Sequence, residues 1–132
     1  MDEIIKKEIE ETEKLIEKTL EKIKRELDFN YKIEDLLKYS SYTIYKEKKP
    51  GRYRILGYFM DENGKQNKEN LFVINKKQAE KLKEEGGLET IKDLFNFLFK
   101  GLKYIKKLKN LKKEKEDIID SAKNLRLIKK RD

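Results

Sequence analysis

Apolar residues recur three or four positions apart at both ends of this chain, and this spacing constrains the fold more than any other feature. Near the N-terminus it joins Ile5, Ile9, Ile16, Leu20, Ile23 and Leu27, with one gap of seven, between Ile9 and Ile16, whose middle holds Thr12. Near the C-terminus, after a start at Thr90, it joins Ile91, Leu94, Phe95, Leu98, Leu102, Ile105 and Leu108. Each run predicts an amphipathic helix with one side to bury, because such spacing places side chains on one face.

Between these runs the pattern changes from helical to β. Asn30 is expected to cap a short helix over residues 31–39. β-prone residues then predict strands at 42–45, 52–60 and 71–74. Lys49-Pro50-Gly51-Arg52 fits a type II turn, and Asn63-Gly64 marks a second reversal, followed by a polar stretch expected to form a flexible tip. The middle of the chain therefore predicts a three-stranded antiparallel meander.

The last third of the chain is expected to be helical. Asn75 and Gln78 fit a capping box, and Gly86-Gly87 should end that helix. The long stripe dissolves into charge over 109–115, so a separate final helix is predicted from Ile118. Together the patterns predict an α+β fold, a single domain over 1–132, in which a long N-terminal helix and C-terminal helices bundle with a small meander. Its parts are helical 1–39, β 41–75, helical 76–128 and a basic tail at 129–132.

Composition argues against most catalytic and metal chemistry. The chain has no Cys and no His, so it lacks a thiolate and the commonest general base, and no cofactor, metal or enzymatic activity is expected. Asp61, Glu69 and Lys77 could be imagined as a metal nuclease site, but 26 acidic residues produce such trios by chance. No apolar string is long enough to span a bilayer, and a cytoplasmic location is expected. Abundant Lys and Ile are typical of an AT-rich genome, and enrichment in Lys and Glu would also suit a thermophile.

The formal net charge of +8 is unevenly distributed. Acidic residues outnumber basic ones in 1–30, and the reverse holds in 89–132. Two groups are candidate nucleic-acid-binding residues, because cations engage phosphates and aromatic rings stack on bases. The first surrounds the first β turn and comprises Tyr45, Lys46, Lys48, Lys49, Arg52, Tyr53 and Arg54. The second lies on the C-terminal helix and comprises Lys100, Lys103, Lys106 and Lys107. The alternative is that these cations only solvate amphipathic elements.

The sequence thus favours a non-catalytic accessory or regulatory protein that binds DNA or RNA through the basic hairpin and the Lys-rich helix. The alternative is a protein-interaction module, either a homodimer formed through the N-terminal helix or an inhibitor or adaptor of a larger nucleic-acid-processing complex. Phe97 and Phe99 flank the main helical stripe, so they either widen the buried face or mark a partner or membrane-surface contact.

Overall fold

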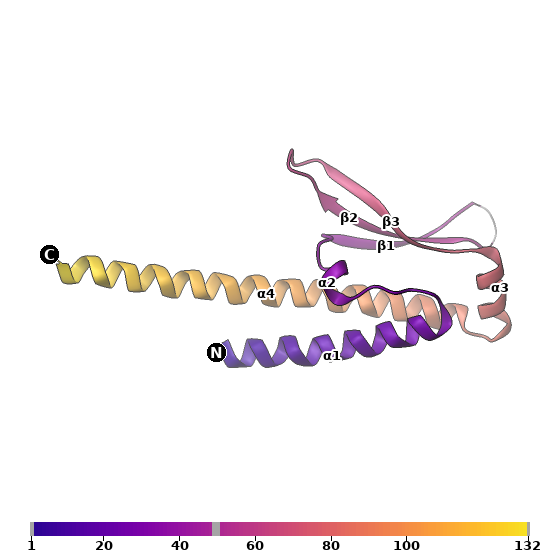
Figure 1. Ribbon diagram of the computed structural model, residues 1–132, viewed down its shortest axis with the longest axis horizontal. Coiled ribbons are helices and arrows are strands. Elements are labelled where there is room, and N and C mark those ends of the chain that lie inside the picture. The colour runs from indigo at the N-terminus through magenta and orange to yellow at the C-terminus, as the bar shows by residue number, and fades with distance from the viewer. Residues whose placement is uncertain (1, 49–50, 132) are drawn as a thin grey trace.

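The computed structural model describes the backbone of residues 2–48 and 51–131, and the side chains of 3–48 and 51–121. In chain order the elements are α1 (Asp2–Glu26), α2 (Ile33–Leu36), β1 (Ser41–Lys46), β2 (Tyr53–Met60), β3 (Gln66–Ile74), α3 (Lys76–Glu84) and α4 (Leu88–Arg131). The strands form one antiparallel sheet in the order β1-β2-β3. Figure 1 shows α4 between α1 and the sheet. The predicted α+β arrangement is confirmed.

The two long helices run antiparallel and pack through the predicted stripe of α1. Ile16 and Ile23 are fully buried, and Ile5, Ile9 and Leu27 nearly so. The helices approach closely at Gly101, where an added Cβ would lie 2.9 Å from Cγ1 of Ile16. At 1.5 Å per residue, α4 is about 66 Å long and α1 about 38 Å. The end of α4 therefore extends past the start of α1 (Figure 1).

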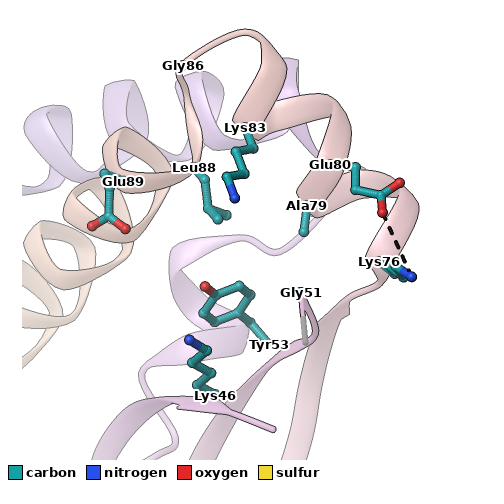
Figure 2. A pocket seen from close by; sticks show the side chains of 10 residues that line it. All are labelled: Lys46, Gly51, Tyr53, Lys76, Ala79, Glu80, Lys83, Gly86, Leu88 and Glu89. Carbon is teal, nitrogen blue, oxygen red and sulfur yellow. Dashed lines mark ion pairs between the residues drawn. The ribbon is translucent and has the colours of Figure 1, made fainter. Parts of the chain in front are cut away.

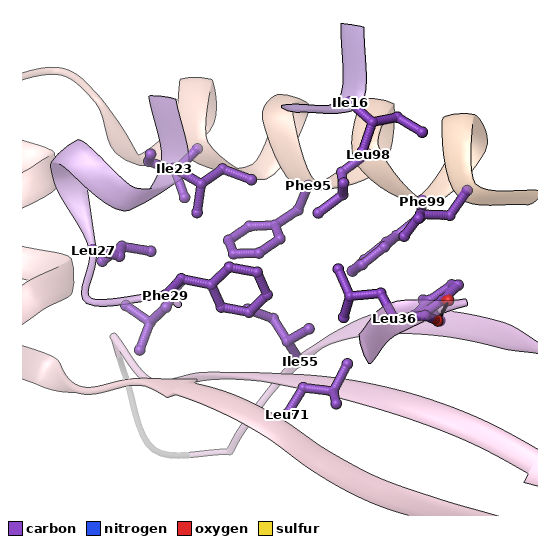
Figure 3. Packing of buried hydrophobic residues seen from close by; sticks show 14 of the residues in the cluster. Ile16, Ile23, Leu27, Phe29, Leu36, Ile55, Leu71, Phe95, Leu98 and Phe99 are labelled. Atoms are coloured by element: carbon purple, nitrogen blue, oxygen red, sulfur yellow. Dashed lines mark hydrogen bonds between the residues drawn. The ribbon is translucent and has the colours of Figure 1, made fainter. Parts of the chain in front are cut away.

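Aromatic side chains join the sheet to α4. The ring of Tyr42 in β1 stacks on Phe99 in α4, with centroids 4.9 Å apart and an interplanar angle of 6°. Phe29, in the segment after α1, makes edge contacts with Phe95 of α4 at 5.2 Å and with Phe72 of β3 at 5.6 Å. Figure 3 shows Phe29 and Phe95 at the centre of the core, with α1 residues on one side and Ile55 on the other. One continuous core thus joins all three layers.

The short second helix differs from its prediction. It covers only Ile33–Leu36, and Asn30 does not cap it. The Asn30 amide instead donates to the Asp28 carboxylate at 2.9 Å. The helix begins after Lys32, whose backbone N–H donates to the Asp35 carboxylate at 3.0 Å. A carboxylate three residues into the helix thus replaces the predicted Asn cap.

Two other boundaries also differ. The polar stretch predicted as a flexible tip is part of β3, because residues 66–70 pair with β2. A tight turn precedes it, in which Asp61 Oδ1 accepts from the backbone N–H groups of Asn63 and Lys65, both at 2.9 Å.

The prediction of a separate final helix is also wrong, since α4 is continuous. Residues 109–117 contain no Gly or Pro, and Lys and Glu are good helix formers, so charge alone does not end the helix. The predicted type II turn includes residues 49 and 50, which lie outside the described residues.

A close contact with glycine fixes the sheet against the segment that contains α2. The buried Tyr39 ring lies over Gly57 in the middle of β2, and its hydroxyl donates to Glu69 on β3 at 2.7 Å. A Cβ added to Gly57 would lie 2.7 to 2.9 Å from three atoms of that ring. Only glycine at this position lets the ring reach the strand.

Gly57→Ala should therefore lower the free energy of unfolding by about 1–3 kcal/mol, because the new methyl group must displace a rigid, buried ring. Urea denaturation followed by circular dichroism measures this change. Gly87→Ala is the matched control, since its nearest new contact is an ordinary 3.5 Å from the Leu82 carbonyl oxygen. Equal stability of Gly57→Ala and the wild type would contradict the close contact.

Candidate functional site

A pocket of about 600 Å³ lies where the β1–β2 hairpin meets α3 and the start of α4. Its volume is in the usual range for small-ligand sites. Its walls combine cationic side chains with a small apolar floor, and they are formed by Lys46, Gly51, Tyr53, Lys76, Ala79, Glu80, Lys83, Gly86, Leu88 and Glu89. Two of the predicted residues, Lys46 and Tyr53, thus meet residues of α3 that the sequence analysis did not single out.

Lysines enter this pocket from opposite sides. Figure 2 shows Lys46 rising from β1 and Lys83 descending from α3, with the Tyr53 ring between them. Lys76 pairs with Glu80 at 4.0 Å, whereas Lys46 and Lys83 form no ion pair within the described residues. The other acidic side chain, Glu89, pairs with Lys92 at 3.8 Å. The pocket therefore presents two ammonium groups that no carboxylate of the described chain neutralises.

The local sequence explains why the α3 lysines face the pocket. Asn75 Oδ1 accepts from the Gln78 backbone N–H at 2.8 Å and Gln78 Oε1 accepts from that of Asn75 at 3.0 Å, so the predicted capping box starts α3 at Lys76. Ala79 is buried and attaches the helix to the core. Lys76 and Lys83 are seven residues apart and therefore share one side of α3. The capping box that follows β3 and the seven-residue spacing of these two lysines are visible in the sequence, and together they could have indicated that both lysines lie on one side of α3.

The two arginines of the hairpin share a single glutamate. Arg52 Nε lies 3.2 Å from Glu47 Oε2, and Arg54 Nη2 lies 2.6 Å from Glu47 Oε1. The Glu47 side chain is only 15% exposed, and its backbone N–H donates to the Arg52 carbonyl oxygen at 3.0 Å. Glu47 therefore cancels one of the two positive charges that the sequence assigned to this end of the hairpin.

The predicted tyrosines lie on opposite faces of the sheet. Tyr53 is 7% exposed on the face toward α4, where its ring centroid is 5.9 Å from Lys92 Nζ. Tyr45 pairs with Arg54 across β1 and β2 and is exposed on the outer face. Tyr58, on that same face by strand alternation, has its hydroxyl 3.2 Å from Thr43 Oγ1. Tyr45 thus exposes its ring on the outer face of the sheet, whereas Tyr53 lines the pocket on the inner face.

The predicted lysines of α4 divide into two groups. Lys100, Lys103 and Lys107 are exposed and form no ion pair within the part of the chain that the structure describes. Lys106 instead turns toward the sheet and donates to the Tyr39 carbonyl oxygen. Partial burial lowers the pKa of Lys106 by removing water from its ammonium group. Lys106 therefore helps to hold residues 28–40 against α4.

A row of polar residues leads along α4 from the pocket. Lys92 lies beside Tyr53, and Asn96 and Lys103 follow it at intervals of four and seven, which keeps them on one side of the helix. The row spans about 16 Å from residue 92 to 103. The predicted Lys48 is exposed on the nearby turn, and the predicted Lys49 lies outside the described residues. The pocket and this row, rather than all the predicted cations together, form the candidate site.

The chain matches no protein-family model, no curated protein and no solved structure. Among the described residues no helix has the length and apolar character needed to cross a membrane. Those residues also contain no group of three or more His, Cys, Asp or Glu placed to hold a metal ion. Of the trio considered for a nuclease, Asp61 binds the backbone of its own turn and Glu69 accepts from Tyr39.

Glu47→Gln should release Arg52 and Arg54 for external anions, because an amide cannot balance two guanidinium groups. The variant should elute from a heparin column at higher salt than the wild type. Glu62→Gln makes the same charge change at the exposed turn between β2 and β3, away from both arginines, and controls for net charge. Equal elution of the two variants would show that the Glu47 pairs do not limit access to the arginines.

Proposed function

We propose that this protein binds nucleic acid without transforming it, with a phosphate group held in the pocket between Lys46 and Lys83. The observation that carries the proposal is that two ammonium groups, neither of which has an ion-pair partner among the described residues, converge on a pocket that also contains a tyrosine hydroxyl. Ammonium groups bind phosphate as point charges, and the Tyr53 hydroxyl can donate a hydrogen bond to the same oxygen atoms.

The surroundings of the pocket suit a chain of phosphates better than a single one. Along α4, Lys103 adds a positive charge that has no ion-pair partner within the described residues, whereas Lys92 is paired with Glu89. On the other side, Lys48 and the arginines of the hairpin lie at the adjoining turn. Tyr45 offers an exposed ring on the outer face of the sheet, where an unpaired base can stack.

A binding role without chemistry fits the available side chains. The acidic residues of the pocket, Glu80 and Glu89, are each paired with a lysine. The chain has no His or Cys to serve as a base or nucleophile. We therefore propose an accessory or regulatory protein that holds DNA or RNA for other factors.

The proposal predicts salt-dependent binding that passes through the pocket. Fluorescence anisotropy with a labelled single strand and a labelled duplex, titrated at several salt concentrations, should show affinity falling steeply with salt, by a slope of about 0.7–0.9 per phosphate contact. Lys46→Glu and Lys83→Glu should each weaken binding by about tenfold and reduce the slope by about one.

Lys65→Glu is the matched control, because it makes the same charge reversal at an exposed position in the turn between β2 and β3. It should change affinity much less than either pocket variant. Binding that is insensitive to salt, or equally weakened by all three variants, would contradict a specific phosphate site. The comparison of single strand with duplex identifies the preferred form.

A further inference from the structure

Helix α4 carries a second row of apolar residues, separate from the stripe that it buries. The members are seven residues apart, and Phe97, Tyr104, Leu111 and Ile118 are 49%, 42%, 43% and 67% exposed. A repeat of seven returns to nearly the same side of a helix after two turns. Such a repeat is typical of a seam against another helix, because it matches the supercoil of two helices packed side by side.

The row faces away from the sheet. Lys106 contacts Tyr39 on the sheet side, and Tyr104, two residues earlier, points to nearly the opposite side of α4. There the Tyr104 hydroxyl donates to Glu8 of α1 at 3.0 Å. Leu15, seven residues after Glu8 on α1, is 52% exposed on the same side. The row of α4 and Leu15 of α1 form one apolar band across the open side of the helix pair.

We infer that two copies of this chain associate through this band, with their α4 helices antiparallel and Leu111 near the two-fold axis. Contiguous exposed apolar surface of this kind marks a contact site. In this arrangement Tyr104 of each copy lies near Ile118 of the other. The half-buried Leu108 lies three residues before Leu111, at the alternate position of the four-three spacing, so it continues the apolar contact between Tyr104 and Leu111.

Charge complementarity selects a second copy of the chain as the occupant and sets its direction. Lys107 and Glu114 lie on the outer edge of the row, four residues before and three residues after Leu111. Antiparallel helices place Lys107 of each copy beside Glu114 of the other, so the pair forms twice. Parallel helices would instead place Lys107 of each copy beside Lys112 of the other, and like charges disfavour that arrangement.

The same complementarity holds along a longer part of α4. Residues 100–113 contain seven lysines and no acidic residue, whereas 114–120 contain Glu114, Glu116, Asp117 and Asp120. Antiparallel packing about Leu111 brings the basic half of one helix to the acidic segment of the other. A nucleic acid or an anionic membrane would instead be repelled by that acidic segment.

The arrangement differs from a homodimer formed through the N-terminal helix, which the sequence suggested. The apolar stripe of α1, including Ile16 and Ile23, is already buried within the chain. Phe99 is buried against Tyr42, while Phe97 is exposed in the row. The contact between copies therefore passes through α4, and α1 contributes only its edge at Leu15.

A charge-swap experiment tests the inference in the absence of nucleic acid. Light scattering and sedimentation equilibrium should give the wild type a mass of twice the 16.0 kDa chain. Lys107→Glu and Glu114→Lys should each weaken dimerisation by about tenfold, because each places like charges together twice. The double variant, Lys107→Glu with Glu114→Lys, should restore the wild-type dissociation constant.

A cysteine cross-link tests the register independently, because the natural chain contains no cysteine. Leu111→Cys should form a disulfide-linked dimer under mild oxidation, since residue 111 meets its own copy near the axis. Lys68→Cys, on the exposed face of β3, should not. Circular dichroism of each variant confirms that its helical content is unchanged.

A monomeric wild type at tens of micromolar overturns the inference, and so does a double variant that fails to recover. A monomer that binds anionic lipid vesicles through Leu111 would assign the band to a membrane surface instead. Because the mass is measured without nucleic acid, these outcomes are separate from those that test the phosphate pocket.

Discussion

The contact between aromatic side chains of the sheet and those of α4 supports the rest of the structure. With 45% of its residues charged, the chain has few apolar groups, and it concentrates them where three layers meet. The stacked rings of Tyr42 and Phe99, and the position of Phe29 between Phe95 and Phe72, bury large surfaces with few residues. The sheet is thereby held at a fixed position along α4, and the hairpin, α3 and the pocket are positioned with it.

The same layering separates the two surfaces for which we propose functions. Along the N-terminal part of α4 the sheet covers one side and α1 covers another, so the remaining side stays open there, and the end of α4 extends past both. The pocket lies at the end of the sheet near the start of α4, whereas the apolar band extends toward the other end of that helix. A dimer formed through the band would leave both pockets accessible, because the pocket lies between the hairpin and α3 on the sheet side of α4, whereas Tyr104 points to nearly the opposite side.

Periodicity predicted the elements that bury a regular stripe. The buried positions of α1, the capping box at Asn75 and the Asn-Gly reversal all follow from local physical chemistry. Features that depend on tertiary partners were not predictable in this way. Residues 66–70 are polar and become strand only because β2 offers a pairing edge. Likewise, the sequence shows two arginines and a glutamate near one turn, but only the folded hairpin shows that Glu47 engages both.

In the proposed function, the pairing of Glu47 with Arg52 and Arg54 would affect the rate at which a polyanion binds differently from the rate at which it dissociates. Long-range attraction depends on net charge, and the three side chains together carry only one positive charge. They therefore accelerate the approach of a polyanion less than two free arginines would. If the proposed ligand displaced the carboxylate, both guanidinium groups could hold it, which would slow its departure.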